Sequence, residues 1–247
     1  MRLRQRPLAL LLALCWTNAA LSADLQSARA LVDQQRYPEA IAEFELLVQA
    51  SPANADLLIE AARVNAWADR HAKSAALYQQ AIAVAPARRA DVVLPLAWQL
   101  AWGNRHREAM PLFEEASANA AQQTEALHGL AESQVAINQL PEALATYQAL
   151  SAQSGDLKAR KGEARVLLWL DRDDEAIARY RDILAAYPKD KEAQAGLGRA
   201  LNRSGRHFAA VTAYQTAASD GASLDRDTRI EQVRALRWAG LEDIALQ

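Results

Sequence analysis

The sequence predicts an all-α fold, a right-handed α-solenoid of antiparallel helix pairs with about six and a half repeats. Two observations lead to this prediction. The composition favours helices, because Ala and Leu are abundant while Gly, Pro and β-branched residues are few. A three-point pattern also recurs at steps of 33 to 35 residues, and a period of this length is typical of stacked repeats.

Residues 1–23, which precede the repeats, have the layout of a secretory signal peptide. Three arginines precede an unbroken apolar run over residues 8–16, and the segment after it is short and ends in small residues. Nine apolar residues are too few to cross the roughly 30 Å hydrocarbon core as a helix. We therefore expect cleavage after Ser22 or Ala23, a mature chain without a transmembrane span, and a periplasmic location with outer-membrane association as one option. The alternative is a short hydrophobic helix that is retained.

Cys15 raises the alternative of a lipid-anchored protein. A lipoprotein signal has small residues just before its cysteine, whereas Leu14 precedes Cys15, so this alternative fits poorly. Cleavage after residue 23 leaves no cysteine, and it leaves 25 basic residues against 30 acidic ones, a net charge of −5. Since nucleic-acid-binding proteins carry a basic face, we expect no nucleic-acid partner.

The repeat is marked by one aromatic residue and a small residue one turn before it. The aromatic residues are Phe44, Tyr78, Phe113, Tyr147, Tyr180 and Tyr214. Four residues before each of them lie Ala40, Ser74, Ala109, Ala143, Ala176 and Ala210. The small residue allows the second helix of a pair (helix B) to approach the first (helix A), and the aromatic residue, on the same face, fills the gap to the next repeat. Prolines at 52, 86 and 188 end three of the second helices.

These residues resemble the tetratricopeptide repeat (TPR) family over residues 24–247, nearly the whole mature chain. Leu130-Ala131 and Leu197-Gly198 match the family's large–small pair in helix A, while Ala176, Tyr180 and Pro188 match its helix B. The family's early helix A tryptophan is absent, and repeats three, four and six lack the closing proline. The resemblance implies a binding scaffold in which helix A lines a concave inner surface.

Counting from the small residue divides the solenoid into seven units. The expected units are about 21–54, 55–89, 90–123, 124–156, 157–190, 191–224 and 225–247. In the third unit, Pro95 and Pro111 fall inside the two helices, where we expect a kink or a late helix start. The last unit is incomplete, since the next aromatic residue would be due at position 249. One hypothesis is that the chain is the N-terminal part of a longer protein; the alternative is a natural end in a frayed turn.

Helix A carries a row of Trp and a row of Arg on the face turned away from the core. Four tryptophans lie seven residues before the small residue of helix B. Four residues before this tryptophan position, every repeat except the fourth has an Arg or a Trp. The fourth repeat has Ala136 at the tryptophan position and Glu132 four residues before it. The candidate groove residues are Arg63, Trp67, Trp98, Trp102, Arg165, Trp169, Arg199, Arg234 and Trp238. Arg29 occupies the same position in the first repeat.

Each row has a structural alternative. The tryptophans can wedge between adjacent repeats, and the arginines can form a ladder with acidic residues that recur near the start of helix A. Those acidic residues are Asp56, Asp91, Glu125, Glu192 and Asp227.

No catalytic constellation is recognisable. The four histidines, His71, His106, His128 and His207, are assigned to unrelated repeat positions, and we expect them to be surface residues without metal-ligand spacing. Gly196-Leu197-Gly198 lies inside an expected helix and not in a phosphate-binding loop. We therefore expect no enzyme activity, no metal and no cofactor.

Two function classes remain open. The first is an exported scaffold that mediates protein–protein interaction in the cell envelope. The chain resembles, more weakly, the periplasmic TPR region of Gram-negative outer-membrane proteins that export exopolysaccharides, which implies a place in an exopolysaccharide export or biofilm system. The second is direct polysaccharide binding, in which the indole rings stack on sugars and the arginines bind hydroxyls or carboxylates.

Overall fold

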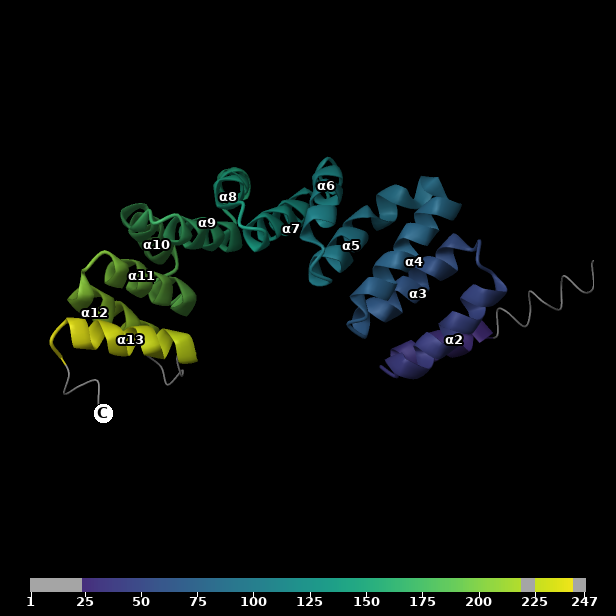
Figure 1. Cartoon of the computed structure of the whole chain (residues 1–247), viewed down its shortest axis with the longest axis horizontal. Coiled ribbons are helices and arrows are strands. Elements are labelled where there is room, and N and C mark those ends of the chain that lie inside the picture. The colour runs from purple at the N-terminus through teal and green to yellow at the C-terminus, as the bar shows by residue number, and fades with distance from the viewer. Residues whose placement is uncertain (1–23, 219–224, 242–247) are drawn as a thin grey trace, which may run out of the picture. The chain divides into compact units, whose positions relative to one another are not determined.

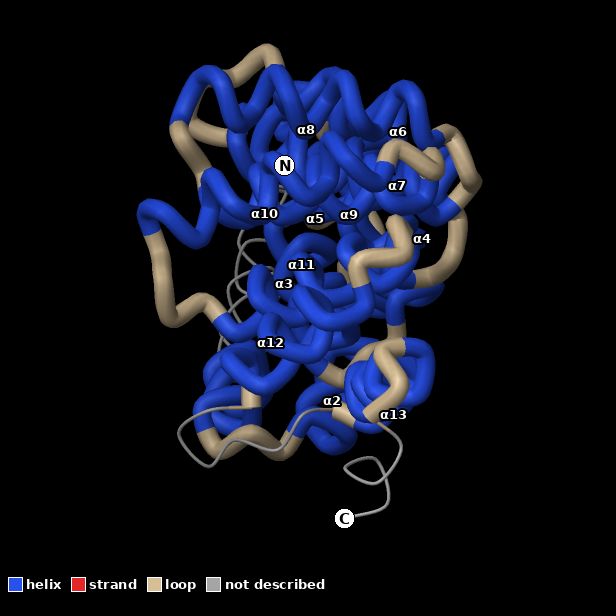
Figure 2. The backbone as a smooth tube through the Cα atoms, turned by 90° about the vertical axis from the view of Figure 1, so that its left-hand side faces the viewer, coloured by secondary structure: helices blue, strands red, loops and turns tan. Residues whose placement is uncertain are grey.

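The computed structural model describes residues 24–218 and 225–241, so the predicted signal peptide and the last six residues lie outside the described part of the chain. Within these two ranges the regular structure is helical, and no strand is present (Figure 2). A helix over residues 24–33 comes first. The following helices are α2 (Tyr37–Ala50), α3 (Ala55–Trp67), α4 (His71–Val84), α5 (Arg89–Trp102), α6 (His106–Ser117), α7 (Gln123–Ala136), α8 (Leu140–Ser154), α9 (Leu157–Trp169), α10 (Asp173–Ala186), α11 (Lys191–Arg203), α12 (His207–Ala217) and α13 (Arg226–Trp238).

The helices divide into two compact units, with the boundary in the sequence between Gln122 and Gln123. Unit 1 runs from the helix over residues 24–33 to α6, and unit 2 runs from α7 to α13 (Figure 1). Consecutive helices pack against each other from α2 to α6 and from α7 to α13, and in unit 2 the first helix α11 also contacts the first helices α9 and α13. Odd-numbered helices from α3 on are the helix A of a repeat and even-numbered helices are its helix B. The predicted architecture of stacked helix pairs is thus confirmed.

The repeat-defining residues form the core. Every small residue from Ala40 to Ala210 is fully buried, and the aromatic residue one turn later is at most 4% exposed in each repeat. Three of the tyrosines lie against glycines of helix A. Tyr147 of α8 contacts Gly162 of α9, where an added Cβ would lie 2.6 Å from the ring, and Tyr180 of α10 lies in the same way against Gly196 of α11. At these two junctions the aromatic ring fills the gap between one repeat and the next, whereas Tyr214 of α12 lies on Gly198 of α11 within one repeat.

Each turn from helix A to helix B contains one residue in the left-handed conformation, five residues before the small residue of helix B. These residues are Gln35, Asp69, Asn104, Asn138, Asp171, Gly205 and Gly240, with φ between 54° and 77°. The next backbone N–H donates to a carbonyl five residues earlier, for example from Arg70 to Asn65 at 2.8 Å. This is the helix-ending motif that satisfies the last carbonyls of a helix, and it gives every helix pair the same short turn.

Helix A begins at a capping side chain in four repeats. Asn54, Asp156, Asp190 and Asp225 each accept a hydrogen bond from the backbone N–H three residues later, at 2.8–3.2 Å. Such caps satisfy a backbone donor that has no partner inside the helix. The expected late helix start in the third repeat is wrong, since a 3-10 turn over Pro86–Arg88 leads directly into α5 at Arg89. Both α5 and α6 continue through Pro95 and Pro111.

The Tyr147–Gly162 contact yields a test of the packing. A Gly to Ala change inside a helix ordinarily stabilises it by roughly 0.5–1 kcal/mol. At Gly162 we expect the opposite sign, a loss on the order of 1–3 kcal/mol from overpacking, because the new methyl group would overlap the buried Tyr147 ring. The free energy of unfolding in urea measures the change. Lys158→Ala on the exposed face of the same helix is the control, with an expected change within about 1 kcal/mol, and a stabilised Gly162→Ala protein would contradict the packing described.

Candidate functional site

The four tryptophans of the predicted row are each the last residue of a helix A. Trp67, Trp102, Trp169 and Trp238 end α3, α5, α9 and α13. Their exposed fractions are 54%, 57%, 46% and 60%. Each lies two residues before the left-handed residue of the turn, so the helix-ending motif holds the indole at the edge of its repeat. Trp is a large, rigid side chain that carries much of the energy of protein interfaces when it becomes buried there.

One edge of the indole lies against the preceding repeat in three of the four cases. Trp67 packs against Tyr37 with ring centroids 6.2 Å apart, Trp102 against His71 at 5.8 Å, and Trp238 against His207 at 5.2 Å. The partner is always the first residue of the preceding helix B. These tryptophans therefore bridge two repeats and still present about half of their surface to solvent.

Two further indole contacts lie within a helix A, and one joins helix A to helix B. Trp98 stacks on Trp102 with centroids 5.3 Å apart and an interplanar angle of 25°, and it also packs edge-to-face on Phe113 of α6 at 5.0 Å. The guanidinium of Arg165 lies over the Trp169 ring, 5.6 Å from its centroid.

The expectation for the histidines is wrong on two points. His71, His106 and His207 share one repeat position, the first residue of helix B, three residues before the small residue. The sequence alone could have revealed this shared spacing. His128 is also not a surface residue, since it is 6% exposed. Its Nε2 lies 2.8 Å from Oδ2 of Asp156, the cap of α9, and since a carboxylate can only accept, the ring nitrogen donates.

The arginine row is partly engaged in ion pairs within and between repeats. Arg29 donates to both carboxylate oxygens of Glu60 in the next helix A, and Arg234 pairs with Glu231 at 2.7 Å. Arg165 reaches Glu192 of the next repeat only at 4.0 Å. The fourth repeat, which breaks the row with Glu132, has the opposite arrangement, because Lys158 of the next repeat pairs with Glu132 at 2.8 Å. Glu132 and Lys158 occupy the same two repeat positions as Arg165 and Glu192, with the signs of the charges exchanged, so both junctions place opposite charges at these positions.

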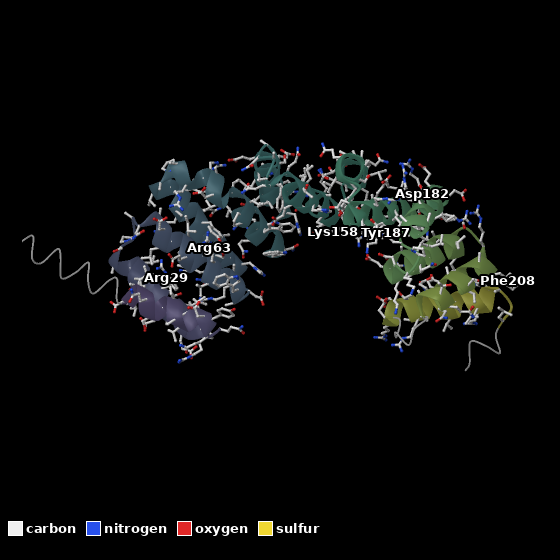
Figure 3. All side chains as sticks on the ribbon, turned by 180° about the vertical axis from the view of Figure 1, so that it is seen from behind. Arg29, Arg63, Lys158, Asp182, Tyr187 and Phe208 are labelled. Carbon is white, nitrogen blue, oxygen red and sulfur yellow. The ribbon has the colours of Figure 1, made fainter. Side chains whose placement is uncertain are left out.

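Six of the nine predicted groove residues line three cavities, and Trp98, Trp102 and Trp169 line none of these three. In unit 1, Arg63 and Trp67 lie with Arg29, Asp33 and Glu60 around a cavity of about 300 Å³, and Figure 3 marks Arg29 and Arg63, on the first helices of the first two repeats. In unit 2, a cavity of about 310 Å³ lies between α9, α11 and the start of α13, and another of about 600 Å³ lies between α11, the start of α12 and α13. Arg165 lines the first, Arg234 and Trp238 line the second, and Arg199 lines both.

The tyrosines beneath this face are held neutral by burial. Burial raises the pKa of Tyr180 to about 12, although the nearby Arg199 and Arg165 act in the opposite direction. Burial also raises the pKa of Tyr78 and of Tyr147, against the opposing effects of Arg63 and Arg165 respectively. These phenols therefore serve as packing groups and not as acids or bases at neutral pH.

The sequence reasoning also missed a buried carboxylate. Glu163 of α9, 3% exposed, occupies the position at which two other repeats have Leu130 and Leu197. Arg179 donates to it from Nε at 2.9 Å, and Gln148 and Ser151 of α8 donate at 3.3 and 3.4 Å. These partners offset the desolvation of the carboxylate. In the described ranges, no three His, Cys, Asp or Glu side chains are arranged to hold a metal ion. Nor is any described helix both long enough and apolar enough to span a bilayer.

The His128–Asp156 bond predicts a dependence of stability on pH. Burial raises the pKa of Asp156, but the hydrogen bonds from His128 and from the Ala159 backbone outweigh it, so the pKa lies below its ordinary value. A lowered carboxyl pKa stabilises the folded state above the ordinary value of about 3.9, and the contribution is lost as the pH falls through the folded-state pKa. We expect Asp156→Asn to lower the free energy of unfolding by about 1–3 kcal/mol at pH 6 and by less at pH 3. An equal loss at both pH values in urea denaturation would contradict this.

The exposed tryptophans and buried tyrosines predict different losses of stability. Tyr180→Ala removes a 4% exposed ring and should lower the free energy of unfolding by about 3–5 kcal/mol, as for other large buried aromatics. Trp169→Ala in the same repeat removes a half-exposed ring and should cost about 1 kcal/mol, since its main contact is a cation–π pair at the surface. Thermal and urea denaturation measure both variants, and comparable losses would show that Trp169 is mainly a structural wedge.

Comparison with solved structures agrees with this architecture. A TPR protein from Parabacteroides merdae ATCC 43184 has a TM-score of 0.73 at 12% identity, covering 92% of this chain and 90% of that chain. YrrB, described as a TPR protein with an unusual peptide-binding site, has a TM-score of 0.58 at 18% identity, covering 80% and 98%. MamA from Desulfovibrio magneticus RS-1 has a TM-score of 0.57 at 16% identity, covering 64% and 89%.

At these identities the solved structures show the fold alone, and no curated protein matches the chain in sequence. The family assignment comes from the family model. The model for the tetratricopeptide repeat matches residues 25–92 and 162–224, just over half of the chain. The chain therefore belongs to the tetratricopeptide repeat family.

Proposed function

We propose that this chain is an exported, non-catalytic scaffold that binds a partner protein or peptide in the cell envelope through the exposed face of its first helices. One observation carries the proposal: the tryptophans that end α3, α5, α9 and α13 are 46–60% exposed. An exposed row of rigid aromatic side chains, with arginines one turn away, has the composition of an interaction hot spot.

The three cavities lined by this row support the same proposal. They lie between successive first helices, so a segment running across the repeats contacts each helix in turn. An extended peptide or a partner helix is bound by repeat surfaces of this kind through side-chain anchors placed at intervals. YrrB, a TPR protein of similar fold, is described as having a peptide-binding site, although an unusual one.

The proposed location rests on the N-terminal sequence. Residues 1–23 combine arginines, a nine-residue apolar run and small residues in the order of a signal peptide. Within the envelope, we place the scaffold in an exopolysaccharide export or biofilm system. The support for that placement is the resemblance of the repeats, including the segments 165–169 and 234–238, to the periplasmic TPR region of such exporters.

Direct binding of a polysaccharide is the second candidate function. The observation that favours it is the stacked pair of Trp98 and Trp102, with Trp102 57% exposed. Flat indole surfaces can cover the apolar faces of sugar rings, and arginine can donate several hydrogen bonds to hydroxyls in a fixed geometry. In this alternative the ligand is the polymer itself and no partner protein is needed on this face.

A capture experiment with a matched control distinguishes the two candidates. The full chain is immobilised and exposed to solubilised envelope proteins, in parallel with a Trp169→Ala/Trp238→Ala variant and with Phe208→Ala. Phe208 is a 66% exposed aromatic residue on α12, a helix B (Figure 3). We expect a protein that binds the wild type and Phe208→Ala but is lost from the double variant by about tenfold or more, as for interface hot spots, while thermal denaturation of all three stays similar.

The captured protein is then purified and titrated calorimetrically against the same variants. In a parallel assay, oligosaccharides of glucose and of N-acetylglucosamine are added while tryptophan fluorescence is followed. A saturable change with an oligosaccharide that Trp102→Ala abolishes, together with no protein sensitive to the double variant, would overturn the protein-scaffold proposal in favour of the polysaccharide alternative.

A further inference from the structure

Three arginines of unit 2 share one repeat position and form a continuous strip. Arg165 on α9, Arg199 on α11 and Arg234 on α13 each lie eleven residues before the small residue of helix B. The cavities of about 310 and 600 Å³ meet at Arg199, which lines both. Successive first helices contact each other here, so the strip crosses three repeats of one unit.

The strip carries an excess of positive charge. The first cavity is lined by Lys161, Arg165, Lys191 and Arg199 against the two carboxylates of Glu192 and Asp225. The second is lined by Arg199, Arg203 and Arg234. Arg203 pairs with Asp171 and Asp173, and Arg234 pairs with Glu231, so Arg199 supplies the unmatched charge there. The excess around the first cavity and Arg199 is opposite in sign to the formal net charge of −2 of the whole chain. A concave site of one sign attracts a ligand of the other and raises its rate of association.

The matching cavity of unit 1 does not share this excess. It is lined by two cations, Arg29 and Arg63, and by two carboxylates, Asp33 and Glu60. Both carboxylate oxygens of Glu60 accept hydrogen bonds from Arg29, so this guanidinium fork is already occupied. The two units thus present the same repeat surface with different charge.

Two of the three arginines of the strip lack a close carboxylate partner, whereas Arg234 pairs with Glu231 at 2.7 Å. The closest carboxylate oxygen to Arg165, on Glu192, is 4.0 Å away. Among the residues that the structure describes, Arg199 forms no ion pair. The accessible N–H groups of a guanidinium without a carboxylate partner remain available to the carboxylate of a ligand.

We propose that the strip of Arg165, Arg199 and Arg234 binds an extended acidic segment of a partner protein, with one side-chain carboxylate at each repeat. This inference rests on the proposed function and names the chemistry of the partner. Packed helices have axes about 8–10 Å apart, and an extended chain advances about 3.3 Å per residue. The strip therefore selects acidic residues that are three positions apart, and the exposed Trp169 and Trp238, one turn beyond Arg165 and Arg234, contact the residues between them.

A side-chain carboxylate fits this strip better than an acidic sugar. The planar fork of arginine binds a carboxylate best in a bidentate geometry. The flexible stems of Asp and Glu allow each carboxylate to reach that geometry separately at every repeat. Carboxylates fixed to rigid sugar rings share one spacing and one orientation, which three cavity walls of different composition do not offer.

Calorimetric titration of the full chain with synthetic peptides tests the proposal. The probes are (Glu-Gly-Ser)₄, the neutral (Gln-Gly-Ser)₄, and an isomer of the first peptide with its four Glu adjacent. We expect (Glu-Gly-Ser)₄ to bind, the isomer to bind several-fold more weakly, and the neutral peptide to show no binding. The affinity should fall as salt is raised, because exposed charges are screened.

The variants separate the strip from general charge effects. Arg199→Gln and Arg165→Gln/Arg199→Gln should lower the affinity for (Glu-Gly-Ser)₄, the double variant by about tenfold or more. Arg181→Gln, at an exposed position on the second helix α10 of the same unit, removes the same charge away from the strip and should leave the affinity unchanged. Circular dichroism confirms that the variants are folded.

Equal affinity of the acidic and neutral peptides, or equal losses in Arg181→Gln and Arg199→Gln, would overturn the proposal. Binding of an oligogalacturonate but not of (Glu-Gly-Ser)₄ would overturn it as well. These outcomes leave the proposed scaffold function intact if the tryptophan double variant still loses its captured protein. Peptide binding through the strip, with no protein lost from the tryptophan variant, supports the strip and contradicts the broader role of the tryptophan row.

Discussion

The packing of a buried aromatic ring against a residue with little or no side chain sets the geometry of the repeat junctions. Tyr147 lies on Gly162 and Tyr180 lies on Gly196, in each case across the boundary between one repeat and the next. Interiors are packed too tightly to absorb an extra methyl group without displacement. The closeness of successive first helices, and therefore the cavities between them, follows from these contacts.

The same constraint determines which residues remain exposed. Because the small and aromatic residues of helix B hold one side of helix A in the core, the other side faces outward. The left-handed residue that ends each first helix then places Trp67, Trp169 and their equivalents at the edge of the repeat. Core packing and solvent exposure thereby fall to different residues of the same 13- or 14-residue helices.

The repeat period, the buried aromatic row and the exposed tryptophans were predictable from the sequence because each is marked by one residue type at a fixed spacing. The left-handed turn residues were not, since Gln35, Asn104 and Asp171 differ in type and share only a backbone angle. The histidines were overlooked although their spacing was visible, and the burial of His128 depends on Asp156, 28 residues away.

The charge of the candidate site depends on which arginines are already paired with carboxylates. Arg29 is paired with Glu60, whereas Arg199 has no carboxylate partner among the described residues. Such pairs join different repeats, so identifying them requires the three-dimensional positions of the side chains. The continuous helices through Pro95 and Pro111 show that tertiary packing can override the local preference of proline.

The most direct test of the central claim, that a ring seated on a glycine fixes the junction, is a double-mutant cycle between α10 and α11. The free energy of unfolding is measured in urea for wild type, Gly196→Ala, Tyr180→Leu and the double variant. If the ring occupies the space above Gly196, the smaller side chain relieves the overlap, and the two changes are coupled by about 1–3 kcal/mol in favour of the double variant. Additive losses, within about 0.5 kcal/mol, would contradict the account.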